Sequence, residues 1–183
     1  MKTFHFRDRK PARGGRGIKD FWRDRKAASA LEFALLALPT ILLLLGILEV
    51  ALVYVGTFSL EEAVDYGARL VRTGQAQDWD ATTFKNNMCT ALVPPLTCSG
   101  LQVDVTSNYD SFNDVTSSDP LNADGSLKND FSYNPGGSGQ IVVVRAYYDW
   151  PLIAKFPKGI ALSNMANGDR LLEATAVFRN EPF

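Results

Sequence analysis

Residues 25–54 read RKAASALEFALLALPTILLLLGILEVALVY, and the uncharged run from Phe33 to Leu48 within them decides how the chain is organised. Eleven residues of this run are Leu, Ile or Phe, and a glutamate stands at each end, Glu32 and Glu49. At about −0.5 kcal/mol for each such residue, the run contributes roughly −5 kcal/mol to membrane insertion. The run alone is shorter than a hydrocarbon core of ~30 Å, so we expect one transmembrane helix over residues 27–55, with both carboxylates near the interfaces.

Two other interpretations of the apolar run are a buried core helix and a cleaved secretory signal. A core helix of this composition needs a larger soluble domain than this chain of 183 residues offers. A signal peptide needs small residues after its apolar part, whereas the motif Ala28-Ser29-Ala30 precedes it. The sequence therefore favours a retained anchor. Pro39 predicts a mild kink rather than a break, because a helix in lipid must satisfy its backbone groups locally.

The charges on the two sides of the anchor have opposite signs. Residues 1–26 contain ten Lys or Arg and three Asp, and the residues after them contain nine Lys or Arg and seventeen Asp or Glu. The positive-inside rule predicts a basic cytoplasmic leader over residues 1–26 and an extracytoplasmic domain over residues 56–183, in a single-pass protein of the inner membrane. This distribution excludes a uniformly basic nucleic-acid-binding protein.

Beyond the membrane, the helix is expected to continue, so that it runs from about Ala28 to Thr73 and stops at Gly74. Apolar or small residues recur on one face at positions 60, 64, 67 and 71. Four small residues permit close approach, either by a sheet or by another helix: Gly56, Ala63, Gly67 and Ala68.

The sequence of the extracytoplasmic part predicts an α+β fold, in which the long helix packs on a small, mostly antiparallel sheet. Asp80 is expected to cap a short helix that runs to about Leu92. Strands are predicted over residues 101–107, 141–150 and 171–179, with an Asn167-Gly168 turn before the last one. The polar segment 108–140 is predicted to be a long loop, either functional or mobile.

Cys89 and Cys98 are the only cysteines of the chain. Outside the cytoplasm, two cysteines nine residues apart are expected to form a disulfide, worth about 2–3 kcal/mol. The alternative is two unrelated buried thiols. A metal site is not expected, because His5 in the leader is the only histidine, and Asn122-Ala-Asp-Gly125 lacks the remaining ligands of a calcium loop.

Several of these features together resemble the TadE-like family, the minor pilins or pseudopilins of the Tad (tight adherence) pilus system. They are the stretch quoted above with its Glu32-Phe33-Ala34 and Gly46-Ile47-Leu48-Glu49, and the aromatic Tyr54. A second resemblance lies in Tyr133-Asn-Pro-Gly136, the strand 141–148, Trp150-Pro151-Leu152 and the closing LLEATAVFRNEPF. The resemblance implies a pilin-like fold.

The resemblance also implies cleavage by a prepilin peptidase between Ala27 and Ala28, which places Glu32 fifth in the mature chain. The family usually has Gly at the position of Ala27 and often Tyr at that of Phe33, so cleavage and an uncleaved anchor both stay open. Glu32 itself has two interpretations. It is favoured near a helix start by the macrodipole, or it pairs with the amine of a neighbouring subunit and sets the register of assembly.

The function that this implies is structural: assembly of an adhesive pilus of type IV, by initiation, priming or capping. The expected partners are the lipid bilayer, major and minor pilins, and a prepilin peptidase. No nucleophile–base pair or cofactor motif is visible, so we expect neither an enzyme nor a cofactor. The alternative is an unprocessed, permanently anchored periplasmic scaffold or binding module.

Overall fold

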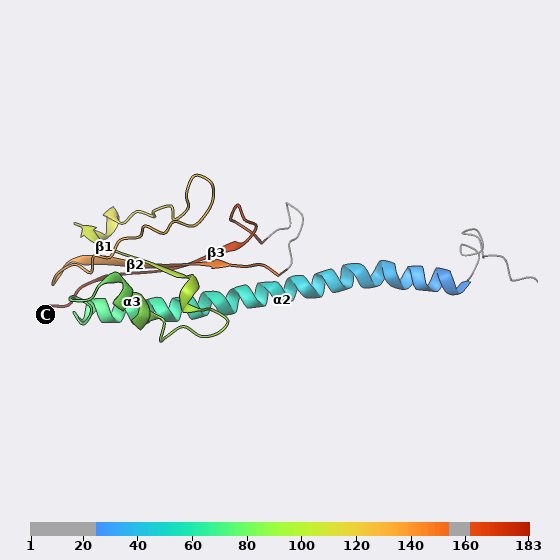
Figure 1. The fold of residues 1–183 in the computed structure, drawn as a ribbon, viewed down its shortest axis with the longest axis horizontal. Helices are drawn as coiled ribbons and strands as arrows, with labels where there is room; N and C mark the ends of the chain where they lie inside the picture. Colours follow the sequence, from blue (N-terminus) through green and yellow to red (C-terminus); the bar gives the residue numbers. More distant parts are fainter. Residues whose placement is uncertain (1–24, 154–161) are drawn as a thin grey trace, which may run out of the picture. The chain divides into compact units, whose positions relative to one another are not determined.

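The computed structural model describes residues 25–153 and 162–183, with side chains from Ser29 onward. Contacts divide the chain into two units at Leu44/Leu45, and residues 45–183 are called the folded unit below. The elements in chain order, labelled in Figure 1, are α2 (Arg25–Arg72), α3 (Ala81–Met88), the 3₁₀ turns Cys98–Gly100 and Phe112–Asp114, and the strands β1 (Leu101–Tyr109), β2 (Ile141–Trp150) and β3 (Arg170–Arg179). The predicted α+β class is confirmed.

Helix α2 is continuous through Pro39, close to the predicted range. The hydroxyl of Thr40 donates to the carbonyl oxygen of Leu36 at 2.7 Å, next to the position where Pro39 supplies no backbone donor. The helix ends before Gly74, whose φ of 77° lies in the left-handed region that glycine adopts without strain. Thr73 and Gly74 donate backbone hydrogen bonds to the last turn, so the helix end is capped.

The three strands form one antiparallel sheet in the order β1-β2-β3, with β2 in the centre. Alternate side chains of β2 pack on α2 within the folded unit: Val142, Val144, Ala146, Tyr148 and Trp150. From α2 they meet the stripe that the sequence predicted, because Leu60, Val64, Gly67 and Val71 are all buried. The period of two in the strand and of about 3.6 in the helix therefore bring two apolar faces together.

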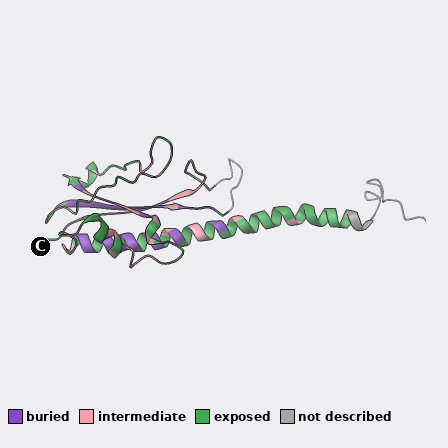
Figure 2. Cartoon of the chain, viewed as in Figure 1, coloured by how far each residue is buried: buried purple, intermediate pink, exposed green. Residues whose placement is uncertain are grey.

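The other face of the sheet is covered by the segment between β1 and β2, as Figure 1 shows. Phe131 of this segment stacks on Tyr147 of β2, with ring centroids 5.0 Å apart. Residues 141–148 of β2 are consequently buried on both faces (Figure 2). The polar segment 108–140, which the sequence left as functional or mobile, is thus a structural cover in the described chain; we call residues 110–140 the cover segment.

Helix α3 begins as predicted but ends earlier. The carboxylate of Asp80 accepts a hydrogen bond from the backbone N–H of Thr83 at 2.9 Å, which holds the pKa of Asp80 below its ordinary value. The α-helix stops at Met88 instead of Leu92, because the backbone then tightens into turns with bonds three residues apart, from Thr90 to Asn87 and from Leu92 to Cys89.

Tyr133 joins the cover segment to the core. Its neighbours Ser132 and Asn134 bond to the backbone of Val105 at 2.8 Å, so the segment runs parallel to β1 at this point. The Tyr133 hydroxyl donates to the carbonyl oxygen of Ala76 at 2.7 Å, and its ring lies 5.1 Å from that of Phe84. Burial, together with the nearby Asp80 charge, raises the pKa of Tyr133 to about 12.

Candidate functional site

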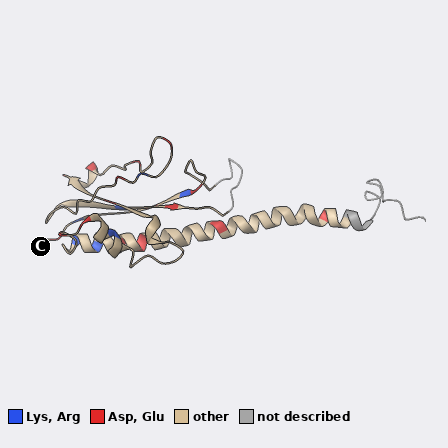
Figure 3. Ribbon diagram, viewed as in Figure 1, with Lys and Arg blue, Asp and Glu red and all other residues tan. Residues whose placement is uncertain are grey.

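The N-terminal part of α2 presents an uncovered apolar surface. From Ser29 to Leu48 the residues are exposed, except Ala37 and Gly46, which are half-buried. The helix is long and apolar enough to cross a membrane, and only 6 % of its most apolar window is buried. A core helix of a soluble protein would bury this window, so the structure disfavours that interpretation. Figure 3 shows the long stretch of α2 without charged residues.

Glu32 lies exposed on this surface. Because α2 begins at Arg25, Glu32 stands about two turns inside the helix and not in its first turn. The macrodipole effect falls off within the first turn, so it does not account for Glu32 in the full-length chain. The two alanines of the predicted processing site, Ala27 and Ala28, belong to the first turn of α2, but their side chains lie outside the part described, as do residues 1–24 of the leader.

Glu49 has a different environment from Glu32, although the sequence predicted that both carboxylates lie near the edges of the membrane span. Its residue is only 2 % exposed. Both of its carboxylate oxygens accept the backbone N–H of Ile153, at 3.2 Å each. Ile153 follows the end of β2 by three residues, so Glu49 ties α2 to the beginning of the β2–β3 connection. A hydrogen bond from a backbone N–H to a carboxylate is stronger than one between neutral groups.

The small residues of α2 pack inside the chain. A Cβ at Gly67 would lie 2.8 Å from Cγ of Met88 and 3.1 Å from Cζ of Phe84, and a Cβ at Gly56 would lie 3.0 Å from Cδ1 of Leu172. Ala63 and Ala68 are buried as well. Both possibilities that the sequence left open therefore occur within the folded unit, since Gly56 is approached by the sheet and Gly67 by another helix, α3.

Cys89 and Cys98 form a disulfide, with Cα atoms 5.4 Å apart. The bridge joins the end of α3 to the 3₁₀ turn that leads into β1. Between the two cysteines, the backbone of Val93 is bonded in both directions to the hydroxyl of Ser59 on α2, at 2.8 and 2.9 Å. The connection between α3 and β1 is thereby attached to the long helix.

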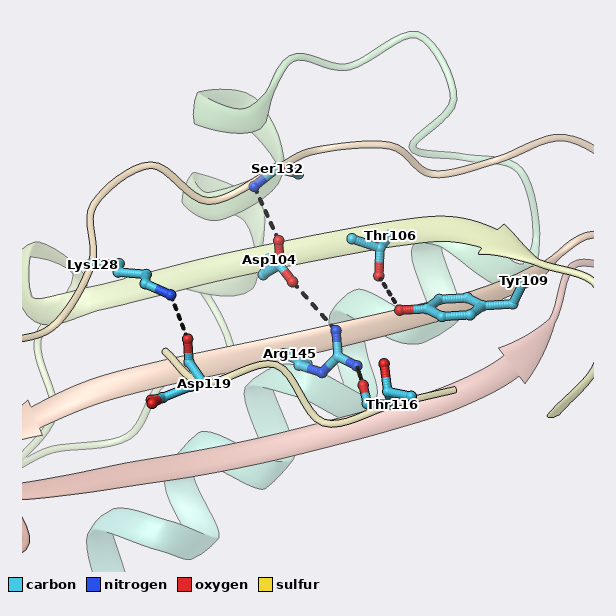
Figure 4. Close-up of polar contacts among 8 residues, drawn as sticks. All are labelled: Asp104, Thr106, Tyr109, Thr116, Asp119, Lys128, Ser132 and Arg145. Atoms are coloured by element: carbon cyan, nitrogen blue, oxygen red, sulfur yellow. Dashed lines mark hydrogen bonds and ion pairs between the residues drawn. The ribbon is translucent and has the colours of Figure 1, made fainter. Parts of the chain in front are cut away.

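A buried polar cluster, shown in Figure 4, holds the cover segment on the sheet. Arg145 of β2 and Asp104 of β1 form an ion pair of 3.4 Å, and Arg145 also donates to the carbonyl oxygen of Thr116 at 2.8 Å. Asp104 accepts the backbone N–H of Ser132 at 3.0 Å. The sequence analysis missed this cluster; a single Arg in the apolar strand IVVVRAYY was the available signal that a buried partner exists.

A pocket lies between α2 and β3. Its volume is about 360 Å³, and it is lined by Asp65, Ala68, Arg69, Arg72, Ala176, Val177 and Phe178. It contains one carboxylate and no nucleophilic side chain. Over residues 25–153 and 162–183, no three His, Cys, Asp or Glu side chains gather as metal ligands. Asp124 of the calcium-loop-like stretch Asn122–Gly125 accepts hydrogen bonds from the backbone N–H and the hydroxyl of Ser126. These bonds lower the pKa of Asp124.

Comparison with known proteins finds one similarity, which lies in α2. The family model described as TadE-like protein matches residues 27–69. No curated protein and no solved structure matches the chain. The C-terminal pattern around residues 133–152 and 171–183 lies outside the matched stretch, so that part of the resemblance stays a prediction. For the N-terminal part the predicted resemblance is confirmed: over residues 27–69 this chain is similar to the TadE-like family.

Proposed function

We propose that this chain is a membrane-anchored minor pilin of a Tad-type pilus system, which helps to initiate, prime or cap the assembly of an adhesive filament. The observation that carries the proposal is the TadE-like match over residues 27–69, which includes the whole uncovered apolar part of α2. A helix segment whose apolar side chains meet nothing in the described part of the chain is suited to lipid first and to neighbouring helices afterwards. The proposed action is lateral packing against major and minor pilins, followed by extraction from the bilayer.

The proposed topology places residues 1–26 in the cytoplasm and residues 56–183 in the periplasm, with residues 27–55 in the inner membrane. The basic leader supports this orientation through the positive-inside rule. The disulfide between Cys89 and Cys98 supports it independently, because structural disulfides persist in oxidising compartments such as the periplasm.

Glu32 is the proposed register group. After cleavage between Ala27 and Ala28 by a prepilin peptidase, the carboxylate of Glu32 in one subunit would pair with the terminal amine of another. Its exposure on α2 leaves it accessible to a neighbouring chain. An unpaired charge in the bilayer is costly, so the pair would favour one axial register over others.

The role is structural rather than catalytic. The TadE-like match associates the chain with pilus components and not with an enzyme class. The pocket between α2 and β3 offers one carboxylate beside two arginines, which is not a pair of groups suited to general acid–base work.

A second candidate function is an unprocessed scaffold or binding module that stays in the membrane. The observation that favours it is Ala27, which stands where the family usually has Gly before the cleavage site. N-terminal sequencing of the membrane-extracted protein decides between the two. A mature chain that begins at Ala28 supports the pilin, whereas an intact leader supports the scaffold.

The pilus role is tested by complementing a deletion strain with variants and counting filaments. Glu32→Gln removes the charge and is expected to abolish or strongly reduce assembly, while Glu32→Asp is expected to retain part of it. Glu62→Gln is the matched control, because Glu62 is an exposed carboxylate on α2 outside the apolar run. Normal filaments with Glu32→Gln, at normal protein level, would contradict the proposed register role, and normal filaments in the deletion strain would contradict the pilus role itself.

A further inference from the structure

Ile153 is the most exposed large apolar side chain of the described part of the folded unit, at 73 %. It comes directly after Pro151 and Leu152, which end β2 and lead into the β2–β3 connection. An isolated exposed isoleucine is common on protein surfaces and by itself indicates nothing. Its position along α2 gives it significance.

The hydrogen bonds to Glu49 fix that position. Since the amide nitrogen of Ile153 lies 3.2 Å from both carboxylate oxygens of Glu49, Ile153 stands at the level of residue 49 on the helix. A hydrocarbon core of ~30 Å takes about 20 helical residues. Counted from Glu32, such a span ends just beyond Glu49. The end of β2 therefore reaches the level at which the hydrocarbon layer stops.

Exposed aromatic side chains occupy the opposite side of α2, about 7.5 Å (Tyr54) and about 13.5 Å (Phe58) beyond Glu49 along the helix axis. Tyr54 and Phe58 are 61 % and 68 % exposed and lie four residues apart, on one face of the helix. Helical geometry places them roughly opposite Glu49, whose side is buried by the sheet. Beyond them the exposed face of α2 becomes charged, with Glu61, Glu62 and Asp65. Aromatic residues followed by charges are typical of the membrane–water interface.

We propose that the base of the folded unit contacts the bilayer through an interfacial rim of Ile153, Tyr54 and Phe58, with Ile153 inserted at the edge of the hydrocarbon layer. The proposal rests on the membrane anchoring under Proposed function and adds that the folded unit itself touches lipid. Glu49 is the positioning residue, because its bonds to the Ile153 amide hold the beginning of the β2–β3 connection at this depth.

Lipid fits the rim better than a partner protein does. Tyr54 and Phe58 lie on one face of α2, whereas Ile153 is held near Glu49 on the opposite, sheet-covered side. The three therefore form no continuous patch, whereas a specific protein interface needs about 800 Å² on each partner. Only a medium that surrounds the helix contacts all three at once. Because Ile153 stands at the level of Glu49, the residue that directly follows the apolar run, that medium is the bilayer.

The test is spin-label accessibility in the full-length protein, reconstituted in vesicles of phosphatidylethanolamine and phosphatidylglycerol. Single cysteines are introduced as Leu44→Cys in the apolar run, Ile153→Cys at the rim, and Val177→Cys. Val177 is 41 % exposed and pairs with Val143, seven residues along β2 from its end at Trp150. The native cysteines stay in their disulfide and do not take the label. Collision rates with oxygen, which concentrates in lipid, and with a water-soluble nickel chelate are then compared.

Leu44→Cys and Ile153→Cys are expected to collide several-fold more with oxygen than with the chelate, and Val177→Cys is expected to show the reverse. A lipid signal at residue 44 with an aqueous signal at residue 153 overturns the inference and leaves the anchor intact. A label at residue 153 that neither reagent reaches shows a covering protein, which also overturns it. An aqueous signal at residue 44 removes the anchor and the inference with it.

Discussion

Asp104 and Arg145 stand opposite each other on β1 and β2, and their side chains form an ion pair of 3.4 Å beneath the cover segment. The side chain of Arg145 is 4 % exposed and that of Asp104 is 11 % exposed, so the pair is nearly removed from water. Each member also bonds to the cover segment: Arg145 donates to the carbonyl oxygen of Thr116, and Asp104 accepts the backbone N–H of Ser132. The pair therefore joins the sheet to the layer above it.

Arg145→Met is expected to destabilise the folded unit by about 3–5 kcal/mol, because it leaves the Asp104 carboxylate buried without its cation. The double variant Asp104→Leu/Arg145→Met removes both charges and is expected to recover part of this loss. The free energy of unfolding in urea, measured in detergent for all four members of the cycle, gives the coupling. Single losses that simply add in the double variant would show that the two residues do not depend on each other.

Tyr133→Phe removes the hydrogen bond to the Ala76 carbonyl and is expected to cost about 0.5–1.5 kcal/mol at pH 7. Its pH dependence is specific. The pKa of Tyr133 is raised from 10.0 to about 12 by burial and by Asp80, so its contribution is complete below pH 10 and is lost as the pH rises through 12. The stability difference between wild type and Tyr133→Phe should therefore shrink over that window.

Urea unfolding at a series of alkaline pH values measures this difference. Tyr66→Phe is the control, because Tyr66 is an exposed tyrosine on α2 and its substitution should change the free energy little at pH 7. A difference for Tyr133→Phe that stays constant from pH 7 to pH 12 would mean that the ring is not held in its neutral form by the fold.

Gly67→Val is expected to destabilise the folded unit by about 1–3 kcal/mol, although valine is a better helix former than glycine. The reason is space, since even a Cβ would lie 2.8 Å from Cγ of Met88. The double variant Gly67→Val/Met88→Ala should lose less than the sum of its single variants. Thermal unfolding followed by circular dichroism measures the losses, and Glu62→Val on the exposed face of α2 is the control. An equal change at both positions of α2 would argue against close packing at Gly67.

Cys89→Ser/Cys98→Ser is expected to lower the free energy of unfolding by about 2–3 kcal/mol, because the unfolded chain then gains the freedom of the opened loop. A reducing agent should produce a similar loss in the wild type and none in the double variant. Unfolding midpoints with and without the reductant are the measurement. An unfolding midpoint of the wild type that does not change with the reductant, although mass spectrometry shows the disulfide to be reduced, would contradict the expected contribution of the disulfide to stability.

Much of this architecture could be predicted from local patterns. The apolar run predicted the long helix, the apolar period of α2 predicted its inward face, and the β-branched and aromatic runs predicted the ranges of β2 and β3, because these signals lie in consecutive residues. The pairing of β1 with β2 could not be predicted in the same way. It depends on which strand satisfies Asp104, more than forty residues away from Arg145 in the chain.

The same limit explains the two sites that the sequence analysis missed. The sequence predicts Glu49 only as a second carboxylate at the edge of the apolar run. Nothing nearby in the sequence shows that the backbone N–H of Ile153, 104 residues away, donates to it. For the cover segment, the sequence predicts only a long loop, either functional or mobile, because its polar composition gives no period. Its order comes from a few specific contacts, such as that of Phe131 with Tyr147, and not from a repeating apolar face.

The central place of β2 has a consequence for how the protein acquires its shape during synthesis. Both β1 and the cover segment leave the ribosome before residue 141, yet each of them has its principal partner in β2. Until that strand emerges, the apolar side chains of β1 have no neighbouring strand, and the cover segment has no surface to lie on. The sheet and the cover segment therefore cannot form until the ten residues of β2 have emerged. A nascent chain that stalls near residue 140 would present an open strand edge to proteases and chaperones.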